Sequence, residues 1–418
     1  MSFVDPAITA LGPPTALQAP GETDHASSGK RVWMVALAVS TAVMCLLAAV
    51  WCVLVMKWLR AGGDAFVENL SPFWAWSRFV HTAPNPSQIY DFSIINAFQH
   101  QICTGYRAVK PFAYPPSFLL LLWPLGLLAV KPAYIAFLAV NLATYIAATW
   151  QRGWGRLSAG LAVVAPSTVI ALAKAQDSLL VAALLFAGCR LVGRRPVVAG
   201  VLFGLMSFKP QFGLLVPIAL ISAREWRCIV AASATVLASV IASGAVFGWN
   251  TWTVFPTAVA SLGAFVSSPG FAAYSPTMTA SLRLLGAGPV IVWIGQILAA
   301  ALAGTTVFWC FRRGFRPLPT AALMAGVFLT TPYAFVYDLP ILTCAVLLVC
   351  REVKTEGPAL RAWELVVLAC VLVLPYPLLV APVRVPYPGV IILLFFGLVV
   401  RRLWAAKHGP EQRSVASL

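Results

Sequence analysis

The sequence has few acidic residues and few residues that could bind a metal ion. Only 13 of its 418 residues are Asp or Glu and only 4 are His, whereas 60% are hydrophobic. With a mean hydropathy of +0.86, the chain carries more apolar surface than a water-soluble core can bury, and a bilayer can accommodate it. The composition therefore predicts an all-α integral membrane protein, a polytopic bundle of transmembrane helices.

Cysteine patterns and long polar segments are absent as well. The nine cysteines are scattered, with no Cys-x-x-Cys pair and no Cys/His spacing typical of zinc sites, so neither a disulfide framework nor a metal centre is expected. We predict no cofactor and no metal.

No polar stretch approaches the length of a soluble domain. The polar N-terminal residues lack a basic segment before an early apolar one, so they do not resemble a cleaved signal peptide.

The net charge of +16 would raise the question of a nucleic-acid partner in a soluble protein. Here the Lys and Arg residues form short clusters between apolar runs, which is typical of the positive-inside rule and of contacts with anionic lipid. We expect membrane lipids as partners and no nucleic acid. The clusters predicted to be cytoplasmic lie at 190–195, 224–227, 312–316, 351–361 and 401–413.

Alternation of apolar segments and basic clusters predicts the topology. The apolar segments are 33–56, 112–130, 132–150, 157–174, 178–193, 196–208, 211–223, 228–247, 288–311, 318–335, 339–350, 363–380 and 386–400. We expect about 12 spans in a membrane domain over 31–403, between disordered cytoplasmic tails at 1–30 and 404–418. Residues 57–111 form the long first external loop and 248–287 a second external loop. Segment 112–130 is rich in proline and is expected to be re-entrant or interfacial; alternatively it spans and a neighbour such as 157–174 does not.

Two acidic residues interrupt long apolar runs. An ionised carboxylate within a membrane segment costs roughly 2.5–3.5 kcal/mol on insertion scales, so Asp177 and Asp338 are functional candidates. The topology places them at the outer face with Lys209 and loop 57–111. Simpler interpretations remain open: Lys209 extends to the headgroups, Asp338 pairs structurally with a basic residue, and Asp91 caps a helix.

The run from Pro111 to Leu128, which contains Tyr114-Pro115-Pro116 and Pro124-Leu125-Gly126-Leu127-Leu128, resembles a signature of glycosyltransferase family 87. Weaker similarities follow in the same order. They are Ala175-Gln176-Asp177, Lys209-Pro210-Gln211, the segment 274–286, and Tyr337-Asp338-Leu339. The resemblance covers about residues 60–345 and implies a GT-C type membrane enzyme, similar to the α-mannosyltransferases that use polyprenyl-phosphate-mannose.

This resemblance implies a sugar, expected to be mannose, that moves from a polyprenyl-phosphate donor to a hydroxyl of a lipid or glycan acceptor. Transfer would take place at the external, periplasmic face of the inner (plasma) membrane. A carboxylate of the first external loop would act as the general base of an inverting reaction. The family's carboxylate position falls on Asn69, so Glu68 ranks first, Asp64 second and Asp91 third.

The other polar groups are assigned to the substrates. We expect Lys209, Arg107 and Lys174 to bind the donor phosphate. The sugar and acceptor hydroxyls are expected to meet six residues: Tyr114, Gln176, Asp177, Gln211, Tyr337 and Asp338. Two other functions stay open. One is a secondary transporter or lipid flippase that uses Asp177 and Asp338 as ion sites, and the other is a non-catalytic membrane protein.

The topology can be tested by cysteine labelling. In a variant without native cysteines, a single cysteine at position 177, 209 or 338 should react with a membrane-impermeant reagent added from outside, because the basic clusters place these positions at the outer face. A cysteine at position 312, in the basic cluster 312–316, serves as the cytoplasmic control. Labelling of position 209 or 338 only from the cytoplasmic side would contradict the shared external site.

Overall fold

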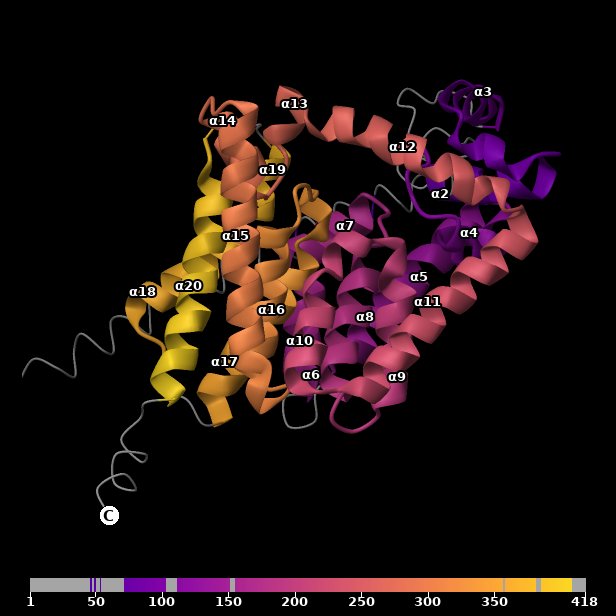
Figure 1. Ribbon diagram of the computed structural model, residues 1–418. Coiled ribbons are helices and arrows are strands. Elements are labelled where there is room, and N and C mark those ends of the chain that lie inside the picture. Colours follow the sequence, from indigo (N-terminus) through magenta and orange to yellow (C-terminus); the bar gives the residue numbers. More distant parts are fainter. Residues whose placement is uncertain are drawn as a thin grey trace, which may run out of the picture. The chain divides into compact units, whose positions relative to one another are not determined.

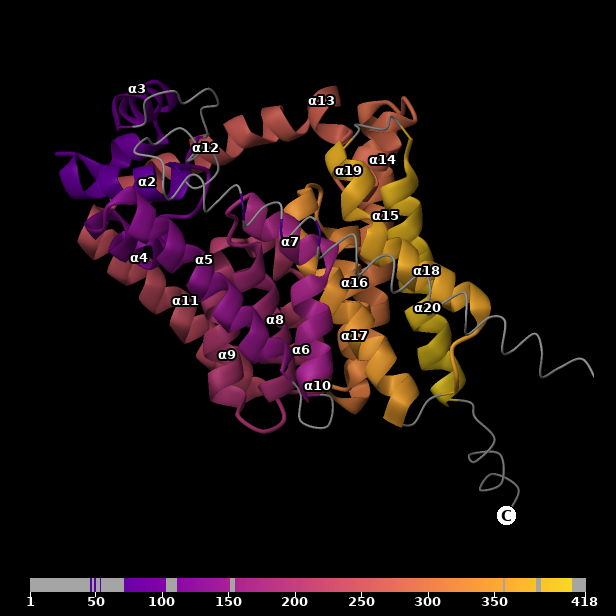
Figure 2. The same cartoon turned by 180° about the vertical axis from the view of Figure 1, so that it is seen from behind.

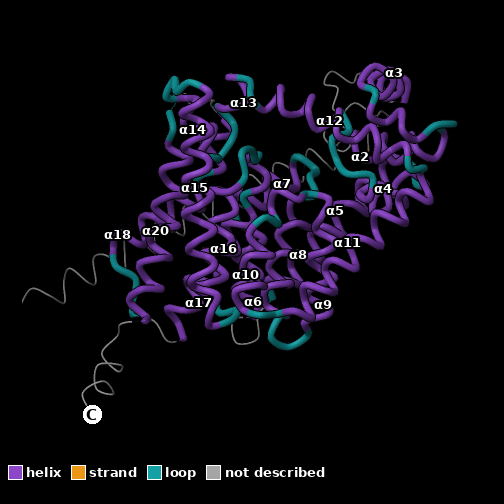
Figure 3. The backbone as a smooth tube through the Cα atoms, viewed as in Figure 1, coloured by secondary structure: helices purple, strands orange, loops and turns teal. Residues whose placement is uncertain are grey.

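The computed structural model describes residues 71–102, 111–150, 155–355, 358–380 and 385–407, together with the single residues 46, 49 and 53. The chain divides into two units, Met1–Val43 and Met44–Leu418. The first unit, which includes the expected tail at 1–30, lies outside the described residues. In the described residues of the second unit, every regular element is a helix (Figure 3). The predicted all-α class is therefore confirmed for this part of the chain.

The first half of the described chain is made of short helices and two long ones. Their bounds are α2 (Ser71–Thr82), η2 (Pro86–Tyr90), α3 (Phe92–Ile102), α4 (Ser117–Leu122), η3 (Trp123–Leu127), α5 (Val130–Thr149), α6 (Gly155–Val164), α7 (Pro166–Ala173), α8 (Ser178–Leu191), α9 (Pro196–Leu205), η4 (Met206–Phe208), η5 (Pro210–Phe212), α10 (Leu215–Ala223) and α11 (Trp226–Phe247). Helices α5, α8 and α9 pack side by side, and α11 lies along α9 (Figures 1 and 2).

The second half of the described chain is also made of short and long helices. Its elements are α12 (Asn250–Val266), α13 (Pro269–Ala272), α14 (Met278–Leu284), α15 (Pro289–Cys310), η6 (Phe311–Arg313), α16 (Pro317–Thr330), η7 (Val336–Asp338), α17 (Pro340–Thr355), α18 (Ala362–Val373), α19 (Pro375–Val380) and α20 (Tyr387–Lys407). Helix α16 packs against α15, α17 and α20, and α17 also packs against α8 of the first half.

Among the described residues, four helices are long and apolar enough to cross a bilayer. They are α5, α11, α15 with its continuation into η6, and α20. Five further apolar helices are shorter, at Ser117–Leu127, Ser178–Leu191, Pro196–Phe208, Pro317–Thr330 and Ala362–Val373. Each predicted apolar segment within the described residues contains a helix, and the expected number of 12 spans stays a prediction.

Burial separates an inner set of helices from an outer one. Helix α16 is buried from Leu318 to Leu329 and α17 from Pro340 to Val349, as expected for helices that are apolar on all sides. By contrast, α11 and α15 expose large apolar side chains such as Leu237 and Ile297. In a membrane protein these exposed side chains contact lipid, so the core helices α8, α16 and α17 are shielded from it.

Close packing between α9 and α11 depends on two glycines one turn apart. A Cβ atom added at Gly200 would lie 2.4 Å from the carbonyl oxygen of Cys228, and one added at Gly204 would lie 2.5 Å from Cβ of Thr235. This Gly-x-x-x-Gly spacing lets two backbones approach each other, which is how membrane helices gain packing without a hydrophobic driving force. Helix α11 is thereby held against α9.

The segments predicted to be external loops are largely helical. The sequence predicts a loop at 248–287, but most of these residues form α12, α13 and α14. Helix α12 runs across the ends of neighbouring helices (Figures 1 and 2), and Asn250 at its start donates a hydrogen bond to Ser87 Oγ. The described part of loop 57–111 is also helical. Segment 112–130 breaks into α4 and η3, whose 11 residues extend only about 17 Å at 1.5 Å per residue, well short of a bilayer of about 30 Å.

We predict that Gly200→Ala destabilises the protein by about 1–3 kcal/mol, because the new methyl group overlaps the α11 backbone. Thermal unfolding of the purified protein in detergent would measure this as a lower midpoint. Gly397→Ala is the matched control, since a Cβ at this position in α20 meets nothing within 4 Å. Equal midpoints for the two variants would mean that α9 and α11 do not need this close approach.

Candidate functional site

Three breaks between helices meet in the interior of the second unit. Asp177 lies in the break between α7 and α8, Lys209 in the break between η4 and η5, and Asp338 at the end of η7. The backbone departs from a helix at each break. Ala175 has a positive φ of 44°, Lys209 precedes Pro210 and is not helical, with φ −122° and ψ 70°, and Pro340 begins α17 two residues after Asp338.

An ion cluster joins the three breaks. Lys209 Nζ lies 2.7 Å from Asp177 Oδ1 and 3.0 Å from Asp338 Oδ1. All three residues are buried, with exposed fractions of 0% for Asp177, 5% for Lys209 and 2% for Asp338. The three residues, which the topology predicts to share one face, thus contact one another, and Asp338 pairs with a basic residue, one of the interpretations left open above. Burial of charges costs several kcal/mol per ion unless they are paired, which explains why the ammonium lies between the carboxylates.

The two carboxylates differ in their hydrogen bonds. Asp338 accepts from Ser178 Oγ at 2.6 Å and from the Phe335 backbone N–H at 2.9 Å, in addition to Lys209. Asp177 contacts Lys209 at 2.7 Å and the hydroxyl of Tyr114, but neither contact has the geometry of a well-directed hydrogen bond. Asp338 is therefore held firmly, whereas Asp177 keeps acceptor capacity.

Aromatic residues surround the cluster. The rings of Phe212 and Tyr337 lie 5.8 Å and 5.7 Å from Lys209 Nζ, within cation–π distance. Tyr114 is close enough for the charges of both aspartates to act on its phenol, and Tyr333 is similarly close to Lys209 and Asp338. Tyr114, Tyr333 and Tyr337 are each partly exposed, so they lie between the buried charges and the surroundings.

Stacked rings connect the cluster to the first described helices. Phe118 of α4 stacks on Tyr114 at 4.4 Å and on Phe208 at 4.6 Å, and Phe208 precedes Lys209 in the chain. The ring of Phe73 in α2 meets the ring of Phe118 edge to face, with 6.1 Å between the ring centroids. The residues from Phe112 to Phe118 therefore pack between α2 and the Lys209 break, and this packing positions Tyr114.

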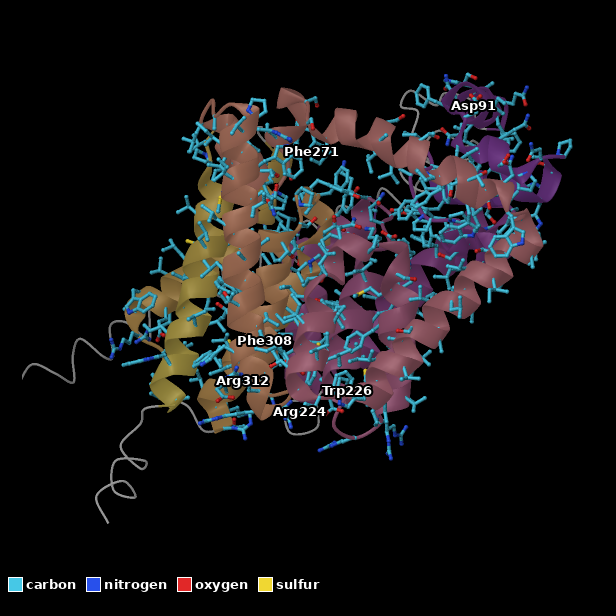
Figure 4. The ribbon with its side chains drawn as sticks, in the orientation of Figure 1. Asp91, Arg224, Trp226, Phe271, Phe308 and Arg312 are labelled. Carbon is cyan, nitrogen blue, oxygen red and sulfur yellow. The ribbon has the colours of Figure 1, made fainter. Side chains whose placement is uncertain are left out.

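The turn that carries Asp338 is held from the other side by α13 and α14. Phe271 contacts Phe335 edge to face at 5.0 Å, and Phe335 stacks on Tyr337 at 4.9 Å. The Thr279 hydroxyl donates a hydrogen bond to the carbonyl of Pro332. In Figure 4, Phe271 and Asp91 lie at one end of the helices and Arg224 and Arg312 at the other. The cluster is thus linked to the end opposite these two basic residues, and which end is external stays a prediction.

The remaining predicted site residues are not all near the cluster. Asp91 is exposed, and its Oδ1 accepts hydrogen bonds from Ser93 and Ile94 at the start of α3. These bonds, chiefly that of the Ser93 side chain, lower the pKa of Asp91. Asp91 therefore caps a helix, one of the two interpretations left open. The predicted residues Asp64, Glu68 and Arg107 lie outside the described residues.

Two predicted neighbours of Asp177 take different roles. The Gln176 side chain is buried and donates to the carbonyl of Lys174 at 3.0 Å. Lys174 is partly exposed at the end of α7 and makes no ion pair with a described residue. Gln211 lies in η5 and is partly exposed.

Sequence reasoning missed Ser178 and Phe212. The signal for Ser178 was its place in the first turn of α8 directly after Asp177. Phe212 had none beyond its position three residues after Lys209.

Among the described residues, no group of three His, Cys, Asp or Glu side chains is arranged to hold a metal ion.

The cluster predicts a stability effect. Lys209→Met leaves two buried carboxylates without a cation, and breaking such a pair costs about 3–5 kcal/mol. We expect a lower thermal midpoint, and the double variant with Asp177→Asn should recover part of the loss because one negative charge is removed. Arg312→Met, an exposed site, is the control. If Lys209→Met unfolds at the same temperature as the wild type, the cluster does not stabilise the fold.

Comparison with known proteins places the chain in a family. Residues 112–337 match the sequence model of Glycosyltransferase family 87, whereas no curated protein and no solved structure matches the chain. The matched region is more than half of the 418 residues. It begins two residues before Tyr114, contains Asp177 and Lys209, and ends directly before Asp338, so the helix breaks that build the cluster lie within it or at its border. The chain therefore belongs to glycosyltransferase family 87.

Proposed function

We propose that this membrane glycosyltransferase moves a sugar, mannose, from a polyprenyl-phosphate donor to a hydroxyl group of a lipid or glycan acceptor. The observation that carries the proposal is the buried cluster of Asp177, Lys209 and Asp338 inside a region that matches the family. A site that combines carboxylates, a cation and aromatic rings is suited to a polar headgroup on a lipid. The reaction would take place at the external face of the inner membrane.

The proposed chemistry is a single displacement with inversion. A carboxylate accepts the proton of the acceptor hydroxyl, and the oxygen attacks the anomeric carbon of the sugar. A new carbon–oxygen bond forms as the bond between the anomeric carbon and the phosphate oxygen breaks. Polyprenyl phosphate leaves with the bonding electrons, and nearby cations stabilise its increased negative charge.

We assign the base to the first predicted loop, with Glu68 before Asp64. Asp91 is the weakest candidate. The hydrogen bonds that cap α3 already occupy its carboxylate, and a carboxylate whose pKa is lowered accepts a proton less readily. A base at Glu68 would act near the cluster, because Phe73 of α2, five residues further along the chain, contacts Tyr114 and Phe118.

The phosphate is assigned to Lys174 and Arg107. The sequence also suggests Lys209 for this role, but two carboxylates already surround its ammonium group, which favours a supporting position instead. Tyr114, Gln176, Asp177, Gln211, Tyr337 and Asp338 remain our assignment for the sugar and the acceptor. Among them, Asp177 and the tyrosines have the clearest geometric support.

We predict that Glu68→Gln lowers the rate of transfer by about 10²–10⁴, because the amide keeps the size of the side chain but cannot accept the proton. Membranes that contain the variant would be incubated with labelled polyprenyl-phosphate-mannose, and label in lipid or glycan would be counted. Asp91→Asn is the control and should keep near-full transfer, since an amide oxygen can still cap α3.

Two outcomes would count against this assignment. If Asp91→Asn abolishes transfer while Glu68→Gln and Asp64→Asn keep it, the base lies in the later part of the loop. If none of the three variants changes transfer, the protein does not use a first-loop carboxylate. An absence of transfer by the wild-type protein with every acceptor fraction would contradict the proposed donor.

A further inference from the structure

We propose that Asp177, Lys209, Asp338 and the adjoining tyrosines bind the neutral sugar ring of the donor, whereas its phosphate binds at Lys174. The inference rests on the proposed function and specifies it, since it divides the donor headgroup between two subsites. The observations that carry it are the charge of the cluster, the unfilled acceptor capacity of Asp177, and the different surroundings of the two lysines.

The charge of the cluster disfavours a phosphate. With both carboxylates ionised, the ammonium and the two carboxylates sum to −1, and all three groups are buried. A phosphate bound to Lys209 would have to displace a carboxylate or lie close to both of them, and repulsion between like charges is strong where water is excluded. A sugar ring carries no charge, so it avoids this repulsion.

The hydrogen-bonding capacity of Asp177 favours hydroxyl groups. An ionised carboxylate only accepts hydrogen bonds, and buried acceptors are almost always satisfied. Asp177 is fully buried, and its contacts with Lys209 at 2.7 Å and with the Tyr114 hydroxyl are not well-directed hydrogen bonds. Asp338, by contrast, is satisfied by Ser178, Phe335 and Lys209. Sugar hydroxyls would supply the donors that Asp177 lacks.

The tyrosines provide the approach to Asp177. Tyr114, Tyr333 and Tyr337 are partly exposed, whereas the charges behind them are buried. A ligand that approaches from this side therefore meets the tyrosines before it meets Asp177. Tyrosine combines an apolar ring with a polar hydroxyl, which suits a sugar that has both C–H and O–H groups on its surface.

Lys174, unlike Lys209, has an ammonium group that no carboxylate of a described residue pairs with. It ends α7 three residues before Asp177, is partly exposed, and makes no ion pair with a described residue. Its ammonium can meet a phosphate without displacing a carboxylate. Because Lys174 and Asp177 belong to the same break, one lipid headgroup can reach both.

Binding of two lipid probes would test this division. The full-length protein in lipid nanodiscs would be titrated with polyprenyl-phosphate-mannose and with polyprenyl phosphate that carries no sugar. We expect Asp177→Asn to weaken binding of the mannosyl lipid by about ten- to hundredfold, because hydrogen bonds to a charged group are lost. The affinity for polyprenyl phosphate without a sugar should stay unchanged. Lys174→Met should weaken both probes by similar factors, and Arg312→Met neither.

Thermal unfolding separates this role from a structural one. Asp177→Asn removes the excess negative charge and leaves the Lys209–Asp338 pair, so the midpoint should stay at or above that of the wild type. A loss of sugar-dependent binding together with an unchanged or higher midpoint would support the proposal. A lower midpoint with equal loss of both probes would assign Asp177 to structure and overturn it.

The remaining outcomes distinguish this inference from the proposed function. If the wild type transfers labelled mannose but Asp177→Asn binds both lipids normally, the sugar subsite is elsewhere and the proposed function stands. If Asp177→Asn weakens both probes equally, the cluster binds the phosphate and the division is wrong. If the wild type binds neither probe and transfers no label, the proposed donor fails and the inference fails with it.

Discussion

The ammonium group of Lys209, shared between two buried carboxylates, is the constraint on which the rest of the site depends. Asp177, Lys209 and Asp338 come from three separate breaks, and each break exposes polar backbone that a membrane helix normally satisfies internally. None of the three charges could be buried alone, because each would carry an uncompensated desolvation cost. Together they fix the relative positions of α8, α10 and α17, which adjoin the breaks. The tyrosines then occupy positions set by this contact, with Tyr337 against Lys209 and Tyr114 near Asp177.

Local sequence determines where the breaks occur, and packing on both sides keeps them in place. Pro210 makes the helical conformation unfavourable for Lys209, and the α13–α14 segment holds the Asp338 turn through Phe271 and Thr279. On the opposite side, Phe118 stacks between Tyr114 and Phe208. Phe118 of the family motif thus acts through packing. It holds the Lys209 break against α4 and places Tyr114 beside the charges.

Much of this arrangement could be predicted from sequence, for identifiable reasons. Apolar runs between basic clusters located the helices, and the rarity of acidic residues singled out Asp177 and Asp338, because charge in an apolar segment is costly. The helices at 248–287 were missed, since Trp, Pro and Gly in that stretch resemble a loop and α12 is held by contacts to distant residues such as Ser87. The partners of Lys209 could not be derived either, because pairing across 129 residues depends on tertiary packing. The same holds for Ser178, whose hydroxyl reaches Asp338.

A second buried ion cluster shows what is unusual about the first. Glu364 is fully buried, and both of its oxygens are occupied. Oε1 accepts from Arg401 and Arg402, and Oε2 accepts from Arg402 at 2.7 Å and from the Arg361 backbone N–H at 2.8 Å. Such a carboxylate has little capacity left for a ligand, and joining α18 to α20 accounts for its contacts. Asp177 is equally buried, but its contacts with Lys209 and the Tyr114 hydroxyl are not well-directed hydrogen bonds, and with both carboxylates ionised its cluster has a net negative charge. Stability alone would favour a single carboxylate beside Lys209. The proposed sugar ligand, which brings hydroxyl groups to Asp177, would account for the second carboxylate.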